Sequence, residues 1–331
     1  DTGLPYASTA RGIDPDGRDV PVMHACGHDM HITCLLGAAG QLAADPSWTG
    51  TLMLVAQPAE ELGTGARAMI ADGLYERFGR PDVVLGQHVA PLPAGFIGLH
   101  PGPAYASTDW LQVTLFGKGG HGSRPEACVD PIVMAAAIVL RLQTIVSREV
   151  AGGDSAVVTV GTLHAGTKMN IIPDTAELEV NVRSYDPHVR DRVVAAVERI
   201  IKAEAAASGA PREPQIVYAA SLPYLYNDPA GSARIGDALR AVVGERLIDP
   251  GAVTGSEDVG LFATEAGVPC VYWLLGGAEP SVFAGAATPA DMIRIMAGIP
   301  SNHSSGYAPA IEPTIGIGVS ALVVAAKEWL G

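Results

Sequence analysis

The densest group of potential metal ligands is the segment Met23–His31, which reads MHACGHDMH. It holds three imidazoles and one thiol, and both side chains are good ligands for zinc-like ions. The histidine spacing would align the three rings on one helix face, but Pro21 and Gly27 favour a loop that leads into a helix. Such a loop would let Cys26 and His28 converge on one point. A polar helix start with unligated histidines is the alternative.

Two adjacent carboxylates follow a predicted buried strand, Thr51–Gln57, in the segment Gln57–Glu61, which reads QPAEE. In open α/β sheets, functional groups collect outside the carboxyl ends of the strands. Two carboxylates there are costly unless they bind cations or protons. One of them could ligate a metal ion while its neighbour serves as a general base. A solvated pair of loop residues is the alternative.

Two further histidines could complete such a centre. His88 lies near the end of a second predicted strand, Asp82–Val89, and could face the same crevice. His303 lies in a polar loop, Asn302–Ser304, that precedes the last predicted helix. A lone histidine at such a place is more often structural. Together with the first two segments, however, one thiolate, several imidazoles and two carboxylates are enough for a two-metal hydrolytic centre.

A glycine-rich segment in the middle of the chain, Gly117–Ser123, reads GKGGHGS. Its glycines would allow the backbone around His121 to approach a ligand closely. A flexible hairpin is the alternative. The segment His164–Asn170 joins two predicted strands at one end of the same part of the chain, and Arg183 lies on the next strand.

The elements that must position the first three segments predict an α/β sheet. Apolar, β-branched runs bounded by glycine or proline predict strands over Thr51–Gln57, Asp82–Val89 and Val268–Leu275. Helical spacing predicts helices over Asp29–Asp45, Gly65–Asp72 and Thr314–Leu330. Strands that alternate with helices indicate a mostly parallel sheet covered on both faces.

The middle of the chain predicts a second domain. The strand Trp110–Phe116 is followed by a helix that starts at Asp130-Pro131, by two strands, by a helix that starts at Asp186-Pro187, and by the strand Pro214–Ala220. This β-α-β-β-α-β order is the ferredoxin-like split unit. We therefore expect an inserted domain over residues 107–220 and a catalytic domain formed by residues 1–106 and 221–331.

Composition excludes several classes of protein. The chain has 331 residues, of which 35 are acidic and 21 basic, so its net charge of −14 argues against a nucleic-acid-binding surface. Hydrophobic residues at 48% provide for a sizeable core. Four scattered cysteines fit free thiols in a reducing cytoplasm. Neither a signal peptide nor an unbroken apolar membrane span is expected.

The segments MHACGHDMH, QPAEE, GQHV, GKGGHGSRP, AGTKMNIIPD, TGSED and NHS occur in this order along essentially the whole chain. In this combination the chain resembles the family of hippurate hydrolases, N-acyl-amino-acid amidohydrolases and indole-3-acetyl-amino-acid hydrolases. These enzymes are related to aminoacylase and to carboxypeptidases of the G type. The resemblance implies a dinuclear metal site in an α/β domain and an inserted lid domain that mediates dimerisation.

Carried over position by position, the resemblance implies five metal ligands, which are Cys26, His28, Glu61, His88 and His303. It implies Glu60 as the general base, and His121 as the lid histidine that reaches the partner subunit's active site and polarises the scissile carbonyl. Asn170 and Arg183 match lid positions that contact the substrate, in particular its carboxylate. Glu257 and Asp258 belong to a motif near the metals that has no assigned role.

The chain departs from the family pattern at two points. In the family, the motif TGLPYAS follows a substantial segment with an early strand, whereas here it begins at Thr2. We therefore expect either that the chain is a fragment or that the structure covers only part of the protein, and in both cases that the missing segment should supply strands of the main sheet. The family also has proline after the NHS triplet, where this chain has Ser305. That change could shift the loop that holds His303 without removing the ligand.

The sequence thus predicts a homodimeric metal-dependent amidohydrolase for N-acyl amino acids or similar small conjugates, with two divalent ions per subunit. Thiolate ligation favours Zn, and carboxylate-rich relatives are often assigned Mn, with Co or Ni as further options. One alternative is a metallo-exopeptidase or dipeptidase on the same scaffold. A second is a metal-binding dimeric fragment without turnover, against which the presence of Glu60 beside Glu61 argues.

Overall fold

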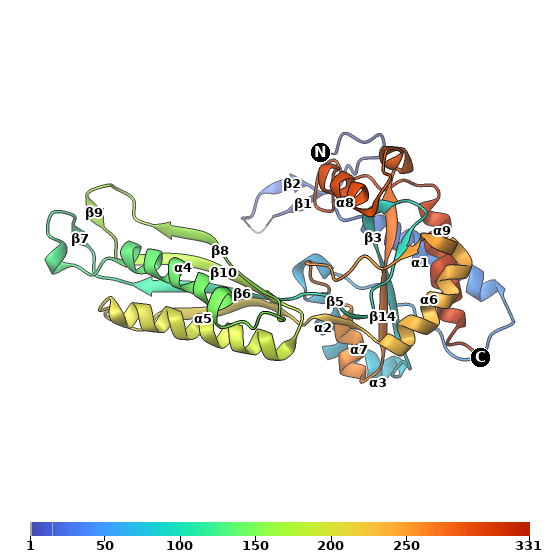
Figure 1. The fold of residues 1–331 in the computed structure, drawn as a ribbon, viewed down its shortest axis with the longest axis horizontal. Helices are drawn as coiled ribbons and strands as arrows, with labels where there is room; N and C mark the ends of the chain where they lie inside the picture. Colours follow the sequence, from blue (N-terminus) through green and yellow to red (C-terminus); the bar gives the residue numbers. More distant parts are fainter. Residues whose placement is uncertain (1, 15) are drawn as a thin grey trace.

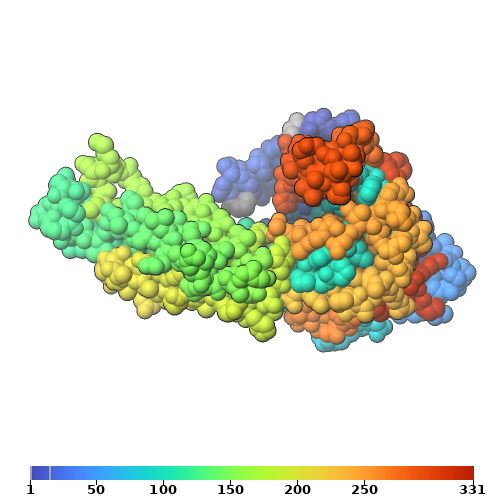
Figure 2. Space-filling view, viewed as in Figure 1, coloured from blue at the N-terminus to red at the C-terminus, as the bar shows by residue number. Residues whose placement is uncertain are grey.

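The structure, a computed structural model, describes residues 2–14 and 16–331. They form an α/β region and a long antiparallel layer that projects from it (Figure 1). The layer is one continuous stretch, residues 107–222, which we call the inserted region. The α/β region is built from the chain on either side of that stretch. In Figure 2 the inserted region, coloured green to yellow, extends well beyond the surface of the α/β region.

The main sheet of the α/β region is mixed and has the strand order β13-β4-β14-β3. β14 is parallel to β3 and β13 is parallel to β4, whereas β14 and β4 are antiparallel. The apolar strand β14 is buried over almost its whole length, as expected of a central strand covered on both faces. The bounds are Val84–Pro93 for β3, Ile97–Gly98 for β4, Leu247–Ile248 for β13 and Cys270–Ala278 for β14.

Helices cover both faces of this sheet. On one face, α1, α6 and α9 pack on apolar side chains of β3, β4 and β14, among them Val89, Val271 and Trp273. Near the other face, α2, α3 and α7 form a smaller cluster around Phe262. The bounds are α1 His28–Ala44, α2 Gly65–Ala71, α3 Leu74–Phe78, α6 Pro229–Val243, α7 Gly260–Ala266, α8 Pro289–Gly298 and α9 Thr314–Lys327.

Short strand pairs complete the α/β region. β1 (Arg11–Ile13) and β2 (Asp19–Pro21) form an antiparallel hairpin near the N-terminus. β5 (Gly102–Tyr105) leads into the inserted region and pairs with β12 (Leu225–Asn227), which leads out of it. This pair therefore fixes the point at which the inserted region leaves the α/β region.

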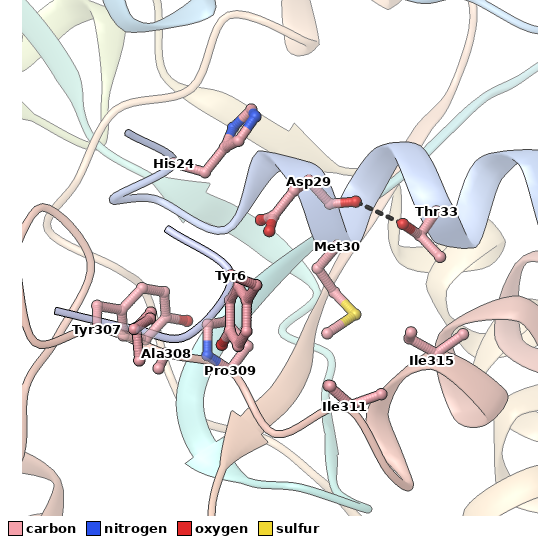
Figure 3. A pocket seen from close by; sticks show the side chains of 11 residues that line it. Tyr6, His24, Asp29, Met30, Thr33, Tyr307, Ala308, Pro309, Ile311 and Ile315 are labelled. Atoms are coloured by element: carbon pink, nitrogen blue, oxygen red, sulfur yellow. Dashed lines mark hydrogen bonds between the residues drawn. The ribbon is translucent and has the colours of Figure 1, made fainter. Parts of the chain in front are cut away.

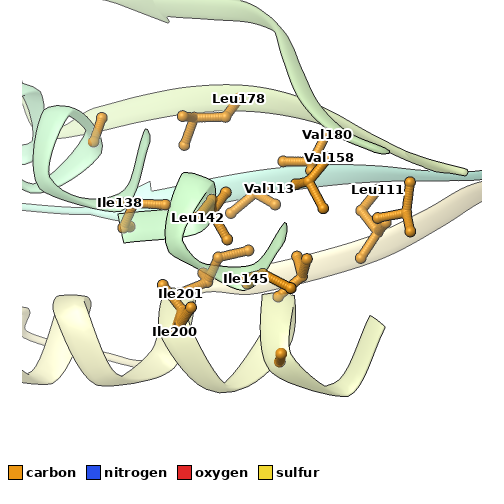
Figure 4. Close-up of a cluster of buried hydrophobic side chains, with 14 of the residues drawn as sticks. Leu111, Val113, Ile138, Leu142, Ile145, Val158, Leu178, Val180, Ile200 and Ile201 are labelled. Atoms are coloured by element: carbon orange, nitrogen blue, oxygen red, sulfur yellow. The ribbon is translucent and has the colours of Figure 1, made fainter. Parts of the chain in front are cut away.

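The inserted region is a four-stranded antiparallel sheet with the order β11-β6-β10-β8, and the helices α4 and α5 pack on one face of it. Its core is the apolar layer between sheet and helices, including Leu111, Ile138 and Ile201 (Figure 4). The bounds are β6 Ser107–Phe116, α4 Pro131–Arg148, β8 Ala156–Ala165, β10 Thr175–Ser184, α5 Pro187–Ala207 and β11 Gln215–Leu222.

Both helices of the inserted region begin at the expected Asp-Pro pairs. The Asp130 carboxylate accepts a hydrogen bond from Ile132 N, and Asp186 accepts from the first-turn amides of α5. These bonds satisfy donors that a helix N-terminus otherwise leaves unpaired. Within the described residues, α4 alone is long and apolar enough to cross a membrane by length and composition, and one side of it is buried on the sheet of the inserted region.

The structure corrects two expectations. The segment Thr51–Gln57 is not a strand, because its backbone has no ladder partner among the described residues. Met53 and Val55 nevertheless pack against the cluster around Phe262, which accounts for the apolar pattern. His88 does not lie near the end of its strand, because β3 continues to Pro93 in parallel with β14.

Candidate metal centre

The loop before α1 brings Cys26 and His28 to the edge of β3. Gly27 has φ +77°, and a Cβ there would lie 2.4 Å from Val89 Cγ1, so only glycine fits. This tight turn puts Cys26 just before the helix and His28 at its first residue. The predicted loop leading into a helix is therefore present, and the glycine is the residue that allows it.

The loop that carries His303 is tied to the same place by hydrogen bonds. His303 N donates to Ala25 O at 2.7 Å. The Asn302 side-chain amide donates to Cys26 O at 3.2 Å and to Val89 O at 3.1 Å. His303 itself adopts φ +69°, a conformation that non-glycine residues rarely take. Asn302 thus joins three distant parts of the chain and holds His303 beside Cys26.

The five residues expected as metal ligands converge in the structure. Cys26 Sγ lies 3.5 Å from His88 Nε2, and His303 Nε2 lies 3.1 Å from Glu61 Oε2. His28 Nε2 lies 3.9 Å from Glu61 Oε1. Two groups of three have all their ligand atoms within 4.8 Å of one another, one made of Cys26, His28 and His88 and the other of Cys26, Glu61 and His303. Cys26 therefore belongs to both groups, and Glu61 lies near His303 of its own group and His28 of the other.

The other two histidines of the segment Met23–His31 do not join these groups. His31 Nε2 accepts a hydrogen bond from Val89 N at 2.9 Å, so its lone pair is already used. Burial lowers the pKa of His31 to about 2, which keeps the ring neutral. The ring packs edge-on against His88, with centroids 4.3 Å apart. His31 is therefore a support for His88.

His24 lies outside the cluster. It lines a cavity of about 190 Å³ with Tyr6, Asp29 and Tyr307 at the start of α1, and Figure 3 shows its ring at the rim of this cavity.

The ring orientation of His88 is set by its backbone contact. His88 Nδ1 lies 2.8 Å from Val89 O, an acceptor only, so Nδ1 carries the proton of the neutral ring. The lone pair on Nε2 then faces Cys26. A backbone carbonyl that fixes the tautomer in this way is typical of metal-ligating histidines.

Glu60 lies next to the ligands in a short 3-10 turn, η1 (Glu60–Leu62), which follows Ala59 at φ +52°. Its carboxylate is 3.5 Å from His28 Nε2 and about a quarter exposed. Burial, followed by the negative charges of Glu257, Glu61 and Asp258, raises the pKa of Glu60 to about 8. Glu60 can therefore exchange a proton near neutral pH, which is the property a general base needs.

Glu257 and Asp258 form the buried wall behind Glu60. Glu257 Oε2 accepts from the Tyr272 hydroxyl at 2.7 Å, and Glu257 Oε1 accepts from the Asp258 and Val259 amides. Asp258 Oδ1 accepts from Gln57 Nε2 at 2.6 Å, and its other oxygen accepts from the Ala66 amide at the start of α2. Asp258 thus fixes the end of the extended segment that leads to Glu60. No pattern in the sequence indicates this role of Tyr272.

The donor set fits divalent cations. One thiol, three imidazoles and a carboxylate that is half exposed are the ligand types that Zn²⁺ and related ions take. No lysine or arginine within residues 2–14 and 16–331 forms an ion pair with the site's carboxylates. Burial and the neighbouring carboxylates raise the pKa of Cys26 to about 12. A bound cation would supply the positive charge that this cluster lacks, and would favour the thiolate.

His121 and Asn170 lie far from this centre within the chain. β7 (Gly120–His121) pairs with β9 (Ile171–Ile172) at the far end of the inserted region, opposite the α/β region (Figure 1). His121 Nδ1 accepts from Ser123 N at 3.1 Å, so the neutral ring carries its proton on Nε2. Gly122 N donates to Asn170 O at 2.8 Å, which brings the two predicted residues together.

Arg183 lies at the opposite end of β10 from Asn170, where the inserted region meets the α/β region. Its Nη1 donates to Thr254 O at 2.8 Å and to Ser256 Oγ at 3.3 Å, and its Nε donates to Asn181 Oδ1. The guanidinium therefore holds the loop that leads to Glu257. The structure does not bring Arg183 and Asn170 to one point within a chain.

The chain matches a peptidase family model and several curated hydrolases. The family model for peptidase family M20/M25/M40 matches residues 1–296. The chain is 39% identical over 259 residues to an N-acetyl-L-cysteine deacetylase of Bacillus subtilis, a match that covers 78% of this chain and 59% of that protein. It is 42% identical over 208 residues to a hippurate hydrolase of Campylobacter jejuni, covering 62% and 51%. The chain thus spans between half and two thirds of these relatives.

Further matches extend the range of related enzymes. A thermostable carboxypeptidase of Saccharolobus solfataricus is 34% identical over 77% of this chain and 64% of its own length. Among solved structures, the YXEP protein of Bacillus subtilis, described as a dinuclear metal-binding peptidase of the M20 family, superposes with a TM-score of 0.72 and 28% identity. That superposition covers 99% of this chain and 77% of the other.

Proposed function

Because this chain belongs to peptidase family M20/M25/M40, we propose that it hydrolyses the amide bond of N-acyl amino acids or similar small amino-acid conjugates. The observation that carries the proposal is the position of Glu60. Its carboxylate lies 3.5 Å from His28 Nε2, at the edge of five convergent ligands, while the adjacent Glu61 contacts His28 and His303. A protein that only binds metal ions and catalyses no reaction would not require this second carboxylate.

The proposed cofactor is a pair of divalent ions held by Cys26, His28, Glu61, His88 and His303. When bound, such ions polarise the scissile carbonyl and make the attacking water more acidic. The thiol favours Zn²⁺, and the carboxylate also suits Mn²⁺, Co²⁺ or Ni²⁺. Glu257 and Asp258 stay outside the ligand set, because their oxygens already accept hydrogen bonds from the protein.

Glu60 moves the proton in the proposed reaction. It takes a proton from the water that attacks the amide carbon, and the water oxygen forms a bond to that carbon. Glu60 then gives the proton to the amide nitrogen as the C–N bond breaks. The products are a carboxylic acid and an amino acid, and Glu60 returns to its starting state.

His121 serves the metal centre of a second subunit in this proposal. Its Nε2–H can donate to the carbonyl oxygen as negative charge develops there. Because the tip that carries His121 is remote from the centre of its own chain, a partner copy must present it. The inserted region is then a ferredoxin-like lid that dimerises through an open sheet edge, since β8 and β11 are edge strands.

Two polar residues of the inserted region, Asn170 and Arg183, are the proposed substrate contacts. Asn170 reaches the same centre as His121, and Arg183 contributes through Nη2, which has no hydrogen-bond partner among the described residues. Both are polar donors suited to the substrate carboxylate. All four cysteines are free in the structure, which is compatible with a reducing cytoplasm, where we place the enzyme.

The test is a hydrolysis assay on hippurate and N-acetylmethionine, with and without a chelator. We expect chelator-sensitive release of the free amino acid. The similarity to a carboxypeptidase favours metallo-exopeptidase activity as the second candidate. Dipeptides are therefore included, and faster hydrolysis of dipeptides than of both N-acyl amino acids would favour that second activity. Metal binding without turnover of any of these compounds would contradict both.

A further inference from the structure

Tyr105 is a buried residue whose hydroxyl has no hydrogen-bond partner within the described part of the fold. It is the last residue of β5, directly before the inserted region, and only 8% of its surface is exposed. Buried tyrosine hydroxyls usually find a hydrogen-bond partner. Those of Tyr75, Tyr272 and Tyr307 donate to Phe262 O, to Glu257 and to Val89 O. The Tyr105 hydroxyl has no such partner among the described residues.

The surroundings of Tyr105 place it on the wall of the metal centre. Its ring packs edge-on against Tyr272, with centroids 5.6 Å apart, and Tyr272 donates to Glu257. The ligand atoms of Glu257 and Glu60 lie within 4.8 Å of each other. The groups whose charges act on the Tyr105 hydroxyl are Glu257, Cys26 and Glu60. Tyr105 thus packs against Tyr272, whose hydroxyl holds Glu257 in the wall of the centre, and it is not one of the expected ligands.

The chemistry of this environment determines what the hydroxyl can do. Burial and the negative charge of Glu257 hold the pKa of Tyr105 well above its ordinary value, so the phenol keeps its proton. A neutral phenol beside a metal centre is a hydrogen-bond donor. The hydroxyl is not among the fully buried unpaired atoms of the described residues, so it is open to a ligand, and a ligand that brings an acceptor would give it the partner that the fold does not.

We propose that Tyr105 is a substrate-binding residue that donates its hydroxyl proton to an oxygen of the N-acyl amino acid bound at the metal centre. This inference rests on the proposed function, because it assumes that such a substrate occupies the centre. It adds a contact from β5, the strand that leads into the inserted region. The α/β region would then contribute this contact to substrate recognition from within the same chain.

The experiment uses metal-loaded protein with the Glu60→Gln substitution, in which N-acetylmethionine binds without turnover. Adding Tyr105→Phe should weaken calorimetrically measured binding by about threefold to tenfold, the usual range for one neutral hydrogen bond. The same substitution in the wild-type chain should leave Tm unchanged or raise it, because the hydroxyl it removes has no partner to lose.

Tyr75→Phe is the matched control. It removes a buried hydroxyl that donates to Phe262 O at 2.6 Å, so it should lower Tm and leave substrate affinity unchanged. Equal affinity with and without the Tyr105 hydroxyl would overturn the inference while leaving the proposed function intact. A fall in Tm with Tyr105→Phe would also overturn it, since that result requires a partner within the fold. No binding to the Glu60→Gln parent would overturn both proposals.

Discussion

Glu60 and Glu61 are neighbours in the sequence, yet the structure gives them different surroundings. Both carboxylates lie near His28, but Glu61 also contacts His303, whereas Glu60 also faces the buried wall that Glu257 forms. Sequence reasoning could divide the two roles only through the family resemblance, because adjacency alone does not show which carboxylate reaches His303. Ala59, with positive φ, begins the short 3-10 turn that carries both carboxylates.

Replacing Glu60 by Gln should separate catalysis from metal binding. We expect kcat to fall by at least about a hundredfold, the scale of losing a general base, because the amide cannot take a proton from water. Metal content, measured on the purified protein, should stay unchanged. Glu61→Gln is the control and should reduce metal content. Loss of metal with the first variant and not with the second would reverse the two roles.

Cys26 and Cys34 make a second matched pair, since both are buried free thiols eight positions apart. Cys26→Ser should weaken Zn²⁺ affinity by at least about tenfold, because even residues that only support ligands contribute that much. Cys34 contacts Ile315 O at 3.9 Å and belongs to the apolar cluster of α1 and α9. Cys34→Ala should leave Zn²⁺ affinity unchanged, and an equal loss in both variants would refute ligation by Cys26.

At the scale of elements, the sequence predicts the main strands and helices of the inserted region, the strands β3 and β14 and the helices α1, α2 and α9 to within a few residues, because capping pairs and apolar periodicity are local signals. It does not predict α3, α6, α7 and α8 or the short strands. The Asp-Pro starts of α4 and α5 are confirmed by their side-chain caps. The prediction of a strand over Thr51–Gln57 is wrong, because a strand requires a hydrogen-bonded neighbouring strand and a local apolar pattern does not show whether one exists. The support role of His31 was missed for a related reason, since it depends on the amide of Val89, 58 positions away.

A buried ion pair joins helix α5 to strand β6 in the inserted region, and its loss should be costly. Arg190 binds the fully buried Asp109 through Nε at 2.7 Å and Nη2 at 2.5 Å. Arg190→Ala would leave this carboxylate with only the Ser221 hydroxyl, and the free energy of unfolding should fall by about 3 kcal/mol. The midpoint of urea unfolding measures the change.

Arg192→Ala is the control on the same helix. Arg192 pairs with Asp154 at 2.7 Å, but both side chains are more exposed, so this substitution should cost about 1 kcal/mol or less. If the two variants unfold at the same urea concentration, the buried pair does not stabilise the fold in the way described.

At the scale of the whole molecule, the distance between the tip of the inserted region and the metal centre predicts a dimeric active site. A mixture of inactive His121→Ala and inactive Glu60→Gln proteins should regain activity after subunit exchange. Each mixed dimer then has one site with both residues intact and one site with both altered, so activity should return to about half per mixed dimer. Native mass measurement confirms that exchange took place.

If His121 acts within its own chain, every active site in that mixture contains one substituted residue, and no activity returns. Only the family resemblance predicts that His121 acts in the partner subunit, because the spacing of His121 from Glu60 along the chain carries no information about which copy meets which. The elongated shape in Figure 1, with β7 far from the α/β region, is the reason for proposing that a partner subunit presents His121.

The central claim is that two divalent ions at the cluster around Cys26 and Glu61 support amide hydrolysis. The most direct measurement is a titration of chelator-treated protein with Zn²⁺ or Mn²⁺, in which bound metal and the release of amino acid from N-acyl amino acids are followed together. We predict that the rate rises with metal binding and reaches its plateau at about two ions per chain. Protein that binds two ions at these residues and hydrolyses no amide would contradict the account.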